Sequence, residues 1–472
     1  MLKPRAIIIG GSLTGMLAAG ALSAYADITI IERDMLPSGA ESRKGLPQAR
    51  HAHLLWSGGV RAIERVLPGF SDVLVEAGGR RVPIFSGLVS LAPQGIWFTR
   101  WRHSQHFMLL STRDLLDATM RAEVLALPHV HVRQRTEFLG LTGSSARVTG
   151  VRIRTDDGES TLDADLVIDA SGRGSRAQTW LGELGLPQVP ERIVDSGVGY
   201  ATRIFRAPGG TDSIPIVNVQ ADPRSGTGTS GVILPVEGDR WLVTVSGTRG
   251  AHPSSDPQEF EAYARGLRHP IIGDLIADAT PLTTVVTTKS TANRRRYFER
   301  APRWPDGFAV LGDAAATYNP VYGQGMSVAA KSVAAMLDEI GTHGFGSPGL
   351  ARRIQCAAAV HVDAAWGLAA TQDAFYEGAS DRPPTMAERL LGAYVDRIVV
   401  ASARSQSVSR ALLDVMSMEK SPTRLLRPRL VLAAALSRSR THRISAPPML
   451  KDMLEAASRP GAHVPRQSPD AV

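Results

Sequence analysis

Three hydrophobic patterns follow one another along the chain, and each predicts a different kind of element. Apolar runs such as RAIII at 5–9 and LVID at 166–169 are almost continuous, which is typical of strands buried on both faces of a parallel sheet. Between 197 and 247 apolar and polar residues alternate, so this stretch predicts an antiparallel sheet. From about residue 349 onward the pattern is mainly helical and rich in Arg and Ala.

The first apolar strand runs directly into a glycine-rich turn, GGSLTG at 10–15. A helical stretch and a second apolar strand follow, and Glu32 ends that strand about 20 residues beyond the turn, as in the dinucleotide-binding fingerprint. We expect Gly10 to make the tight turn, Gly15 to let the helix pack closely, and the helix N-terminus to face a pyrophosphate. Ser12 stands where the fingerprint usually has its second glycine.

A second motif, GFAVLGDAAATYNPVYGQGM, lies at 307–326. Its apolar strand delivers Asp313, whose carboxylate only accepts hydrogen bonds at neutral pH and suits a sugar-like hydroxyl. Gly323 and Gly325 precede an Ala-rich helix, and they allow a flat ring system to approach the backbone closely.

These patterns predict an α/β fold (α+β overall) with a Rossmann-type dinucleotide-binding domain, an antiparallel-sheet substrate domain and C-terminal helices. At 472 residues the chain is too long for one simple core. The predicted boundaries are 1–80, 110–195 and 290–345 for the discontinuous dinucleotide-binding domain, 81–109 and 196–289 for the substrate domain, and 346–472 for the helical region. The tail after Ala457 is expected to be disordered.

Several local elements are also predicted. Strands are expected at 82–85, 95–98 and 106–110, followed by a helix capped by Ser111 or Thr112. A strand at 283–288 is expected to return the chain to the first domain. One face of the antiparallel sheet should carry Ile204, Val217, Val219, Ile233 and Val243.

Composition narrows the function classes. The apolar fraction is 43%, the charged fraction 21% and the net charge +8 with Arg dispersed, so we expect no nucleic-acid partner. The single cysteine, Cys356, excludes an internal disulfide and a Cys-x-x-Cys site. His51 and His53 lack further ligands for a metal. The N-terminus does not resemble a signal peptide, and the apolar run at 430–436 is too short to span a membrane, so we expect a cytoplasmic protein without membrane contact.

Three spaced motifs, GGSLTG with Glu32, DASGRGS at 169–175 and GDAAATYNPVYGQGM at 312–326, resemble the FAD-dependent monooxygenases of the para-hydroxybenzoate hydroxylase type. The resemblance covers roughly residues 5–340. The loop GLPQARHAHLLWSGG at 45–59 and the chain length most resemble the olefin epoxidases of polyether ionophore biosynthesis (monensin and lasalocid pathways), the lasalocid type above all. Ser171, Ala316 and Ser327 depart from the family pattern.

The resemblance implies a Rossmann-type FAD-binding domain and a role for each matching residue. The implied FAD-binding residues are Gly10, Ser12, Leu13, Thr14, Gly15, Glu32, Arg33, Gln48, Arg50, Arg113, Gly312, Asp313, Gly323, Gln324, Gly325 and Met326. The glycine turn would hold the pyrophosphate, Glu32 and Arg33 the adenosine, and Arg113 the phosphate or ribityl region. Asp313 would bind the ribityl chain. The isoalloxazine would lie between the loop 320–326 and the edge formed by Gln48 and Arg50.

The resemblance also implies the activity. Reduced FAD and O2 would form a C4a-hydroperoxide, positioned by Pro320, Gly323 and Gly325, which epoxidises alkenes of a long linear polyketide polyene. No acid or base is assigned. Electrons would come from NADPH or NADH, directly or through a flavin reductase, and the polyene would be free or bound to a carrier protein.

Other activities share this fold. An aromatic hydroxylase would need a Tyr or His relay to deprotonate a phenol, and the sequence assigns no such residue. An FAD-dependent prenyl-chain reductase would saturate an alkene without consuming O2. Flavin halogenases carry a Trp-x-Trp-x-Ile-Pro segment, whereas Trp97 and Trp101 have another spacing and no Ile-Pro follows. A flavoprotein scaffold or redox sensor is the non-catalytic alternative.

Overall fold

The structure is a computed structural model that describes residues 3–43, 45–101, 105–211, 215–223, 228–289, 291–380, 382–437 and 444–448. The predicted disorder of the tail after Ala457 lies outside the described residues.

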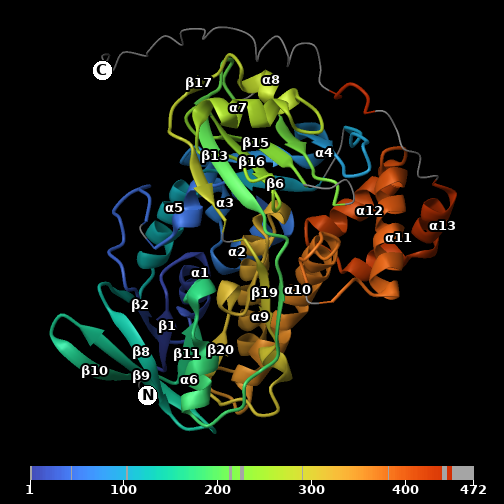
Figure 1. Cartoon of the computed structure of the whole chain (residues 1–472). Coiled ribbons are helices and arrows are strands. Elements are labelled where there is room, and N and C mark those ends of the chain that lie inside the picture. Colours follow the sequence, from blue (N-terminus) through green and yellow to red (C-terminus); the bar gives the residue numbers. More distant parts are fainter. Residues whose placement is uncertain are drawn as a thin grey trace, which may run out of the picture.

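A five-stranded parallel sheet carries the first glycine motif (Figure 1). Its strands, in spatial order, are β20 (Phe308–Val310), β11 (Leu166–Asp169), β1 (Arg5–Ile9), β2 (Asp27–Ile31) and β7 (Val130–Arg133). Every neighbouring pair is parallel. The predicted Rossmann-type α/β fold class is therefore confirmed.

Both faces of this sheet are covered, which explains the continuous apolar runs. Ala6 and Ile8 of β1 pack against helices, whereas Ile7 and Ile9 face a small antiparallel sheet and helix α6. The helical layer consists of α1 (Leu13–Leu22), α2 (Ser57–Val66), α3 (Phe70–Glu76), α5 (Arg113–Leu125), α9 (Gly325–His343) and part of α10 (Leu350–Asp373). The opposite layer consists of β8 (Glu137–Gly143), β9 (Val148–Thr155), β10 (Gly158–Asp163) and α6 (Ala177–Glu183).

A seven-stranded, mainly antiparallel sheet lies above the parallel sheet in Figure 1. It consists of β17 (Thr280–Pro281), β13 (Gly199–Arg206), β16 (Arg240–Gly247), β15 (Ser230–Val236), β14 (Ile216–Val219) and β5 (Leu88–Leu91), with β18 (Val286–Thr288) also paired to β13. Helices α7 (Pro257–Arg265) and α8 (Ile271–Ile276) cover one face. A three-stranded sheet of β3 (Leu54–Trp56), β6 (Phe107–Leu110) and β4 (Arg80–Pro83), together with α4 (Ile84–Gly87), packs on the other.

Four local predictions need correction. Ile204 lies on the face opposite Val217, Val219, Ile233 and Val243, because two-residue alternation in β13 puts Ala201 and Phe205 on the α7 side. The segment 283–288 does not return to the parallel sheet, since its strand β18 pairs with β13. The segment 82–85 is strand only to Pro83, after which α4 begins. Within 95–98 only Trp97 forms a bridge, to Leu91.

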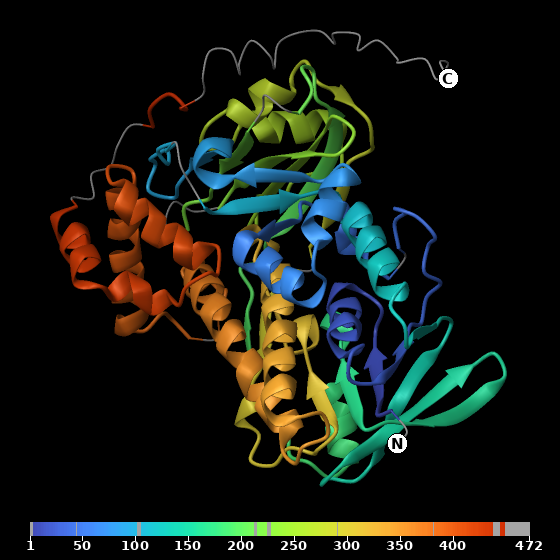
Figure 2. The same cartoon turned by 180° about the vertical axis from the view of Figure 1, so that it is seen from behind.

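The remaining elements join the two sheets and extend the C-terminal side. A ribbon of β12 (Glu191–Val194), β19 (Asn293–Arg296) and β21 (Ala316–Thr317) runs between the sheets. Helix α10 packs beside α9, and α11 (Met386–Ser402), α12 (Gln406–Met416) and α13 (Pro428–Leu436) form a lobe beyond it (Figures 1 and 2). Single-turn 3-10 helices are η1 (Pro47–Arg50), η2 (Gly172–Gly174), η3 (Phe298–Arg300), η4 (Gly312–Ala314), η5 (Pro320–Tyr322) and η6 (Pro422–Leu426). Within the described residues no helix combines the length and apolarity needed to cross a membrane.

Candidate cofactor site

A cavity of about 640 Å³ opens where the strands β1, β2 and β11 end. In open α/β sheets ligands bind at this carboxyl edge, and the volume is that of a large-ligand site. The predicted residues that line it are Gly10, Ser12, Leu13, Thr14, Glu32, Arg33, Gln48, Arg113, Asp313, Pro320, Gly323, Gln324, Gly325 and Met326. The two sequence motifs, 300 residues apart, therefore meet in one cavity. Gly15, Gly312 and Arg50 do not line it.

The glycine turn after β1 acts through close packing. Gly10 has a φ of +100°, and a Cβ there would lie 2.7 Å from the carbonyl oxygen of Ala170. A Cβ on Gly15 would lie 1.8 Å from the carbonyl oxygen of Gly10, so only glycine lets α1 begin against the turn. Ser12, the N-cap of α1, makes no side-chain capping bond, and the first N–H groups of the helix can hold a phosphate.

Ser12 instead accepts a hydrogen bond of 3.0 Å from Nη2 of Arg113. The Nε of Arg113 donates to Asp117 at 2.8 Å, which fixes the guanidinium beside the N-terminus of α1. Two sources of positive potential therefore meet at one end of the cavity, as an anionic pyrophosphate requires.

Glu32 is buried and has a partner that sequence reasoning missed. Its Oε2 accepts from the backbone N–H of Gly11 at 2.9 Å and from Nη2 of Arg43 at 2.8 Å. Arg43 also donates through Nη1 to the carbonyl of Gly11 at 2.9 Å, and its buried Nε has no partner among the described residues. Arg43 lines the cavity. The only sequence signal was its place in the polar loop after the second strand.

Asp313 carries the charge of the second motif and is exposed to the open cavity. Its carboxylate faces the cavity and makes no hydrogen bond or ion pair with the described part of the chain. Burial in the protein raises the pKa of the Asp313 carboxyl, while the positive charges of Arg173 and Arg113 lower it. A carboxylate that lines an open cavity and has no partner on the described part of the chain can accept hydrogen bonds from a ligand, and the hydroxyls of a ribityl chain are donors of that kind.

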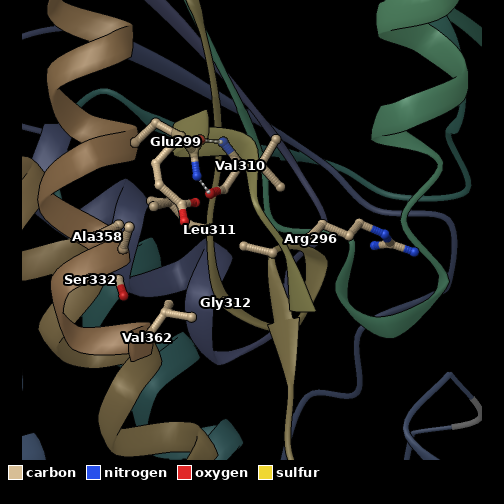
Figure 3. Close-up of a pocket in the computed structure, with 11 residues that line it drawn as sticks. Arg296, Glu299, Val310, Leu311, Gly312, Ser332, Ala358 and Val362 are labelled. Carbon is tan, nitrogen blue, oxygen red and sulfur yellow. Dashed lines mark hydrogen bonds between the residues drawn. The ribbon is translucent and has the colours of Figure 1, made fainter. Parts of the chain in front are cut away.

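Gly312, just before it, has a φ of +64° and supports the site from behind. A Cβ at Gly312 would lie 2.4 Å from Oγ1 of Thr14, so the two motifs touch here. A second cavity of about 10 Å³ is lined by Gly312 together with Val310, Val362 and Ser332 (Figure 3). It has room for about one water molecule and is too small for a cofactor or substrate.

The loop that follows, Asn319 to Gly323, forms the wall at the other end of the cavity. Asn319 caps η5 by accepting from the N–H of Val321, and Gly323 ends the turn with a φ of +62°. A Cβ on Gly323 would meet Leu54 at 3.3 Å. The loop thus lines the cavity with Asn319, Pro320 and Gly323 before α9 begins at Gly325, and the absence of a side chain at Gly323 suits the approach of a flat ring.

Two histidines dismissed as metal ligands also line this end of the cavity. Nδ1 of His51 lies 2.8 Å from Oγ1 of Thr202, and Nδ1 of His53 lies 2.9 Å from the carbonyl of His51. Burial lowers the pKa of His51 to about 4 and that of His53 to about 3, with the charges of Arg50 and Arg113 adding to the respective shifts. Both imidazoles are therefore neutral and weakly basic at neutral pH.

Tyr200, on β13, lines the same end of the cavity. Its hydroxyl donates to Oδ1 of Asn319 at 2.6 Å. Burial, and secondarily the charge of Asp373, raises the pKa of Tyr200 well above its usual range. Neither residue was predicted as part of the site, because the contact joins strands of one sheet to a loop of the other and leaves no trace in local spacing.

The residues present fit FAD. A helix N-terminus with Arg113 suits the pyrophosphate, and the same cavity is lined by Glu32, Arg43 and Asp313. The Nε of Arg43 has no partner among the described residues. In a complex with FAD, Glu32 and Arg43 would hold the adenosine, the N-terminus of α1 with Arg113 the pyrophosphate, Asp313 the ribityl chain and the loop 319–325 the ring. Arg50 is exposed and outside this lining, so the predicted contact of Arg50 with the ring edge has no support in the geometry.

Known proteins agree with this assignment. A family model described as FAD binding domain matches residues 3–343. Protein Rv3254 of Mycobacterium tuberculosis is 28% identical over 425 residues, which cover 85% of this chain and 86% of that protein. The 3-(3-hydroxy-phenyl)propionate/3-hydroxycinnamic acid hydroxylase 2 of Burkholderia vietnamiensis is 28% identical over 302 residues, covering 63% of this chain and 50% of that one.

The crystal structure of a flavoprotein/dehydrogenase from Cytophaga hutchinsonii has the same fold. It superposes with a TM-score of 0.64 at 13% identity, covering 92% of this chain and 98% of that one. The family model spans more than half of the chain and includes both glycine motifs. The chain therefore belongs to the FAD binding domain family, as a flavin-dependent monooxygenase of the hydroxylase-like kind.

Proposed function

We propose that this monooxygenase epoxidises alkenes of a long, apolar, linear polyene, for which a polyketide is the favoured class. When bound and reduced, FAD supplies the activation of O2. One oxygen atom enters the alkene as an epoxide, the other leaves as water, and NADPH or NADH provides the two electrons. The chain's own task is to orient the cofactor and to hold the alkene near it in a site that excludes water.

One observation carries the choice of an alkene: the two histidines that line the cavity beside the loop 319–323 are poor bases. An alkene donates its π electrons directly and needs no deprotonation, whereas a phenol reacts best after it loses its proton. His51 and His53 have a pKa of about 4 and about 3, far too low for efficient proton abstraction from a phenol.

Tyr200 does not fill this role either. Its proton is held by Oδ1 of Asn319, and a neutral amide oxygen does not take up a proton at neutral pH. The next group, the Asp373 carboxylate, accepts from Nδ2 of Asn319 at 2.9 Å, so the amide interrupts any route from Tyr200 to Asp373. Tyr200 and Asn319 hold each other in place and do not form a proton relay.

The surroundings of the loop favour an apolar substrate. Around the loop 319–323, the cavity is lined by Ala52, Leu54, Tyr318, Pro320 and Met326. Hydrophobic contact with such side chains would stabilise a hydrocarbon chain by about 25 cal/mol per Å² of apolar surface removed from water.

Hydroxylation of a phenol is the second candidate. The Burkholderia relative is named for a hydroxyphenyl substrate, and the Tyr200 oxygen beside the loop retains lone pairs that could accept a bond from a phenol. The two functions are separated by offering a linear polyene and 3-(3-hydroxyphenyl)propionate to the FAD-loaded enzyme under labelled O2 with NADPH. We expect label in the polyene. Label in the phenol alone would replace the epoxidase by a hydroxylase.

The electron donor is tested in the same reaction. Assays with NADPH or NADH alone, and with an added flavin reductase, distinguish direct reduction from delivery by a partner. Label in product without the reductase would show that the enzyme takes electrons from the nicotinamide itself.

A further inference from the structure

Helix α10 follows both glycine motifs in the sequence and contributes no residue to them. Its last residue nevertheless contacts the loop at the ring end of the cavity. This residue is Asp373, whose exposed fraction is 1%. A buried carboxylate is costly unless donors surround it. The hydrogen-bond donors around Asp373 therefore indicate which residues stabilise its charge.

Three side chains donate to Asp373 at 2.9 Å or less, and Ser196 also hydrogen-bonds to it. Nδ2 of Asn293 and Nδ2 of Asn319 reach Oδ2 at 2.6 and 2.9 Å, and the hydroxyl of Tyr322 reaches Oδ1 at 2.7 Å. Burial raises the pKa of the Asp373 carboxyl, and these hydrogen bonds lower it. Two of the three donors, Asn319 and Tyr322, stand on either side of Pro320 in the loop that lines the cavity.

Asn319 uses its whole hydrogen-bonding capacity in this cluster. Its backbone N–H donates to Oδ1 of Asn293 at 2.7 Å, and its Oδ1 accepts from Tyr200 and from the N–H of Val321. The amide group therefore has one orientation, which is set by the acceptor Asp373 on one side and the donor Tyr200 on the other.

We propose that Asp373 is a positioning residue of the cofactor site, which fixes the loop 319–323 against the isoalloxazine from the C-terminal helical side. The proposal rests on the FAD site described above and on the proposed placement of the ring at this loop. It makes the ring end of the cavity dependent on a residue outside 3–343, the part of the chain that the family model matches.

Two kinds of variant separate geometry from charge. In Asp373→Asn the new amide oxygen can accept from both Asn side chains, and its NH2 can donate to the Tyr322 oxygen, so the loop stays in place. Asp373→Ala leaves all three donors without their acceptor. Asp363→Ala is the matched control, because Asp363 lies on the same helix, pairs with the buried Arg295 and makes no hydrogen bond to the described loop 319–323.

The readout is FAD binding by the resting protein, without substrate. Fluorescence quenching gives the Kd of FAD, and visible circular dichroism reports the ring environment. We expect Asp373→Ala to raise the Kd at least tenfold and to change the dichroism. Asp373→Asn and Asp363→Ala should stay within threefold of the unchanged protein, with its dichroism. An unchanged Kd and spectrum in Asp373→Ala, or an equal loss in Asp363→Ala, would overturn the proposal.

Two further measurements keep the test decisive if Asp373→Ala fails to fold. Tyr322→Phe removes one bond to Asp373 and should change the dichroism in the same direction, with a smaller rise in Kd. Asn319→Ala combined with Tyr322→Phe should weaken FAD binding less than the sum of the single changes, because both residues act through their bonds to Asp373. An additive pair, or Tyr322→Phe with an unchanged spectrum, would contradict the proposal. No outcome depends on the substrate, so a failure of the epoxidase assignment is recognised separately.

Discussion

The hydroxyl of Tyr200 donates to Oδ1 of Asn319 at 2.6 Å, across the boundary between the seven-stranded sheet and the loop at the ring end of the cavity. A tyrosine at this place could serve as an acid or base only if its proton could move on. The acceptor is an amide oxygen, which does not take up a proton at neutral pH.

Tyr200→Phe therefore distinguishes a structural role of the Tyr200 hydroxyl from a role in proton transfer. The change removes one hydrogen bond, and we expect unfolding to become easier by about 1 kcal/mol. Oxygenation of an alkene should retain its rate within about fivefold, a barrier change of about 1 kcal/mol. Single-turnover rates with a polyene provide the measurement. A loss of two orders of magnitude with unaltered FAD binding would assign Tyr200 to the chemistry.

The Asp313 carboxylate should strengthen FAD binding and lower the stability of the cofactor-free protein. Asp313→Asn removes a charged acceptor for the ribityl hydroxyls, worth about 1.5–3 kcal/mol, and should weaken FAD binding about 10–100-fold. Asp338→Asn, an exposed change on α9 that breaks an ion pair with Arg65, is the control and should leave the Kd of FAD unaltered. Tight FAD binding in Asp313→Asn would refute the ribityl role.

The same substitution should stabilise the FAD-free protein at neutral pH. Burial raises the pKa of Asp313 above its ordinary 3.8, so the folded state holds this proton to a higher pH than the unfolded state does. Stability then falls as pH rises from about 4 through the raised pKa. Urea unfolding of the FAD-free protein should give Asp313→Asn a higher midpoint at pH 7, with the gap narrowing toward pH 4. An equal midpoint at both pH values would contradict the raised pKa.

Acid should destabilise the fold through the buried histidines. The folded pKa of His51 is about 4 against an ordinary 6.5, so below pH 6.5 the unfolded chain binds a proton that the folded chain does not. This stability is complete above pH 6.5 and is lost as pH falls toward 4, by up to about 1.4 kcal/mol per pH unit.

Urea unfolding between pH 7.5 and 5 tests this slope. His51→Gln should reduce it, whereas His131→Gln, which removes an exposed histidine of β7, should leave it unaltered. If His51→Gln kept the full slope, the imidazole of His51 would not be the neutral, buried group that the structure describes.

Gly15 is the position of the glycine turn that least tolerates a side chain. A Cβ there would lie 1.8 Å from the carbonyl oxygen of Gly10, so Gly15→Ala must move α1 away from the turn. We expect a loss of about 3 kcal/mol of stability together with loss of FAD. Gly182→Ala in α6, where a Cβ meets nothing within 4 Å, should be neutral or slightly stabilising. Absorbance of bound FAD and thermal unfolding measure both effects.

Local patterns predicted the parallel sheet and one end of the site well. The run at 5–9 is apolar because both faces of β1 are covered, and Gly10, Gly15 and Asp313 carry constraints that act within a few residues. Such constraints are visible in spacing. The prediction for Ile204 was wrong, because alternation shows which residues of one strand share a face. It does not show which face of the neighbouring strand they match.

The other end of the site depends on contacts between distant segments. Tyr200, Asn319 and Asp373 come from a strand, a loop and a helix end that only the fold brings together. Arg43 meets Glu32 through a loop whose course the sequence does not specify. Arg50 was placed at the ring edge by resemblance, but its side chain is exposed away from the cavity lining.

Oxygen transfer to an alkene without deprotonation of the substrate can be followed in a single labelled reaction. The FAD-loaded enzyme is given NADPH, ¹⁸O-labelled O2 and a linear polyene, and the product is analysed by mass spectrometry. We expect one labelled oxygen for each alkene lost, at a rate that shows no basic limb governed by a cavity group between about pH 6 and 9. Saturated product without label, or label only in a phenol offered in competition, would contradict this expectation.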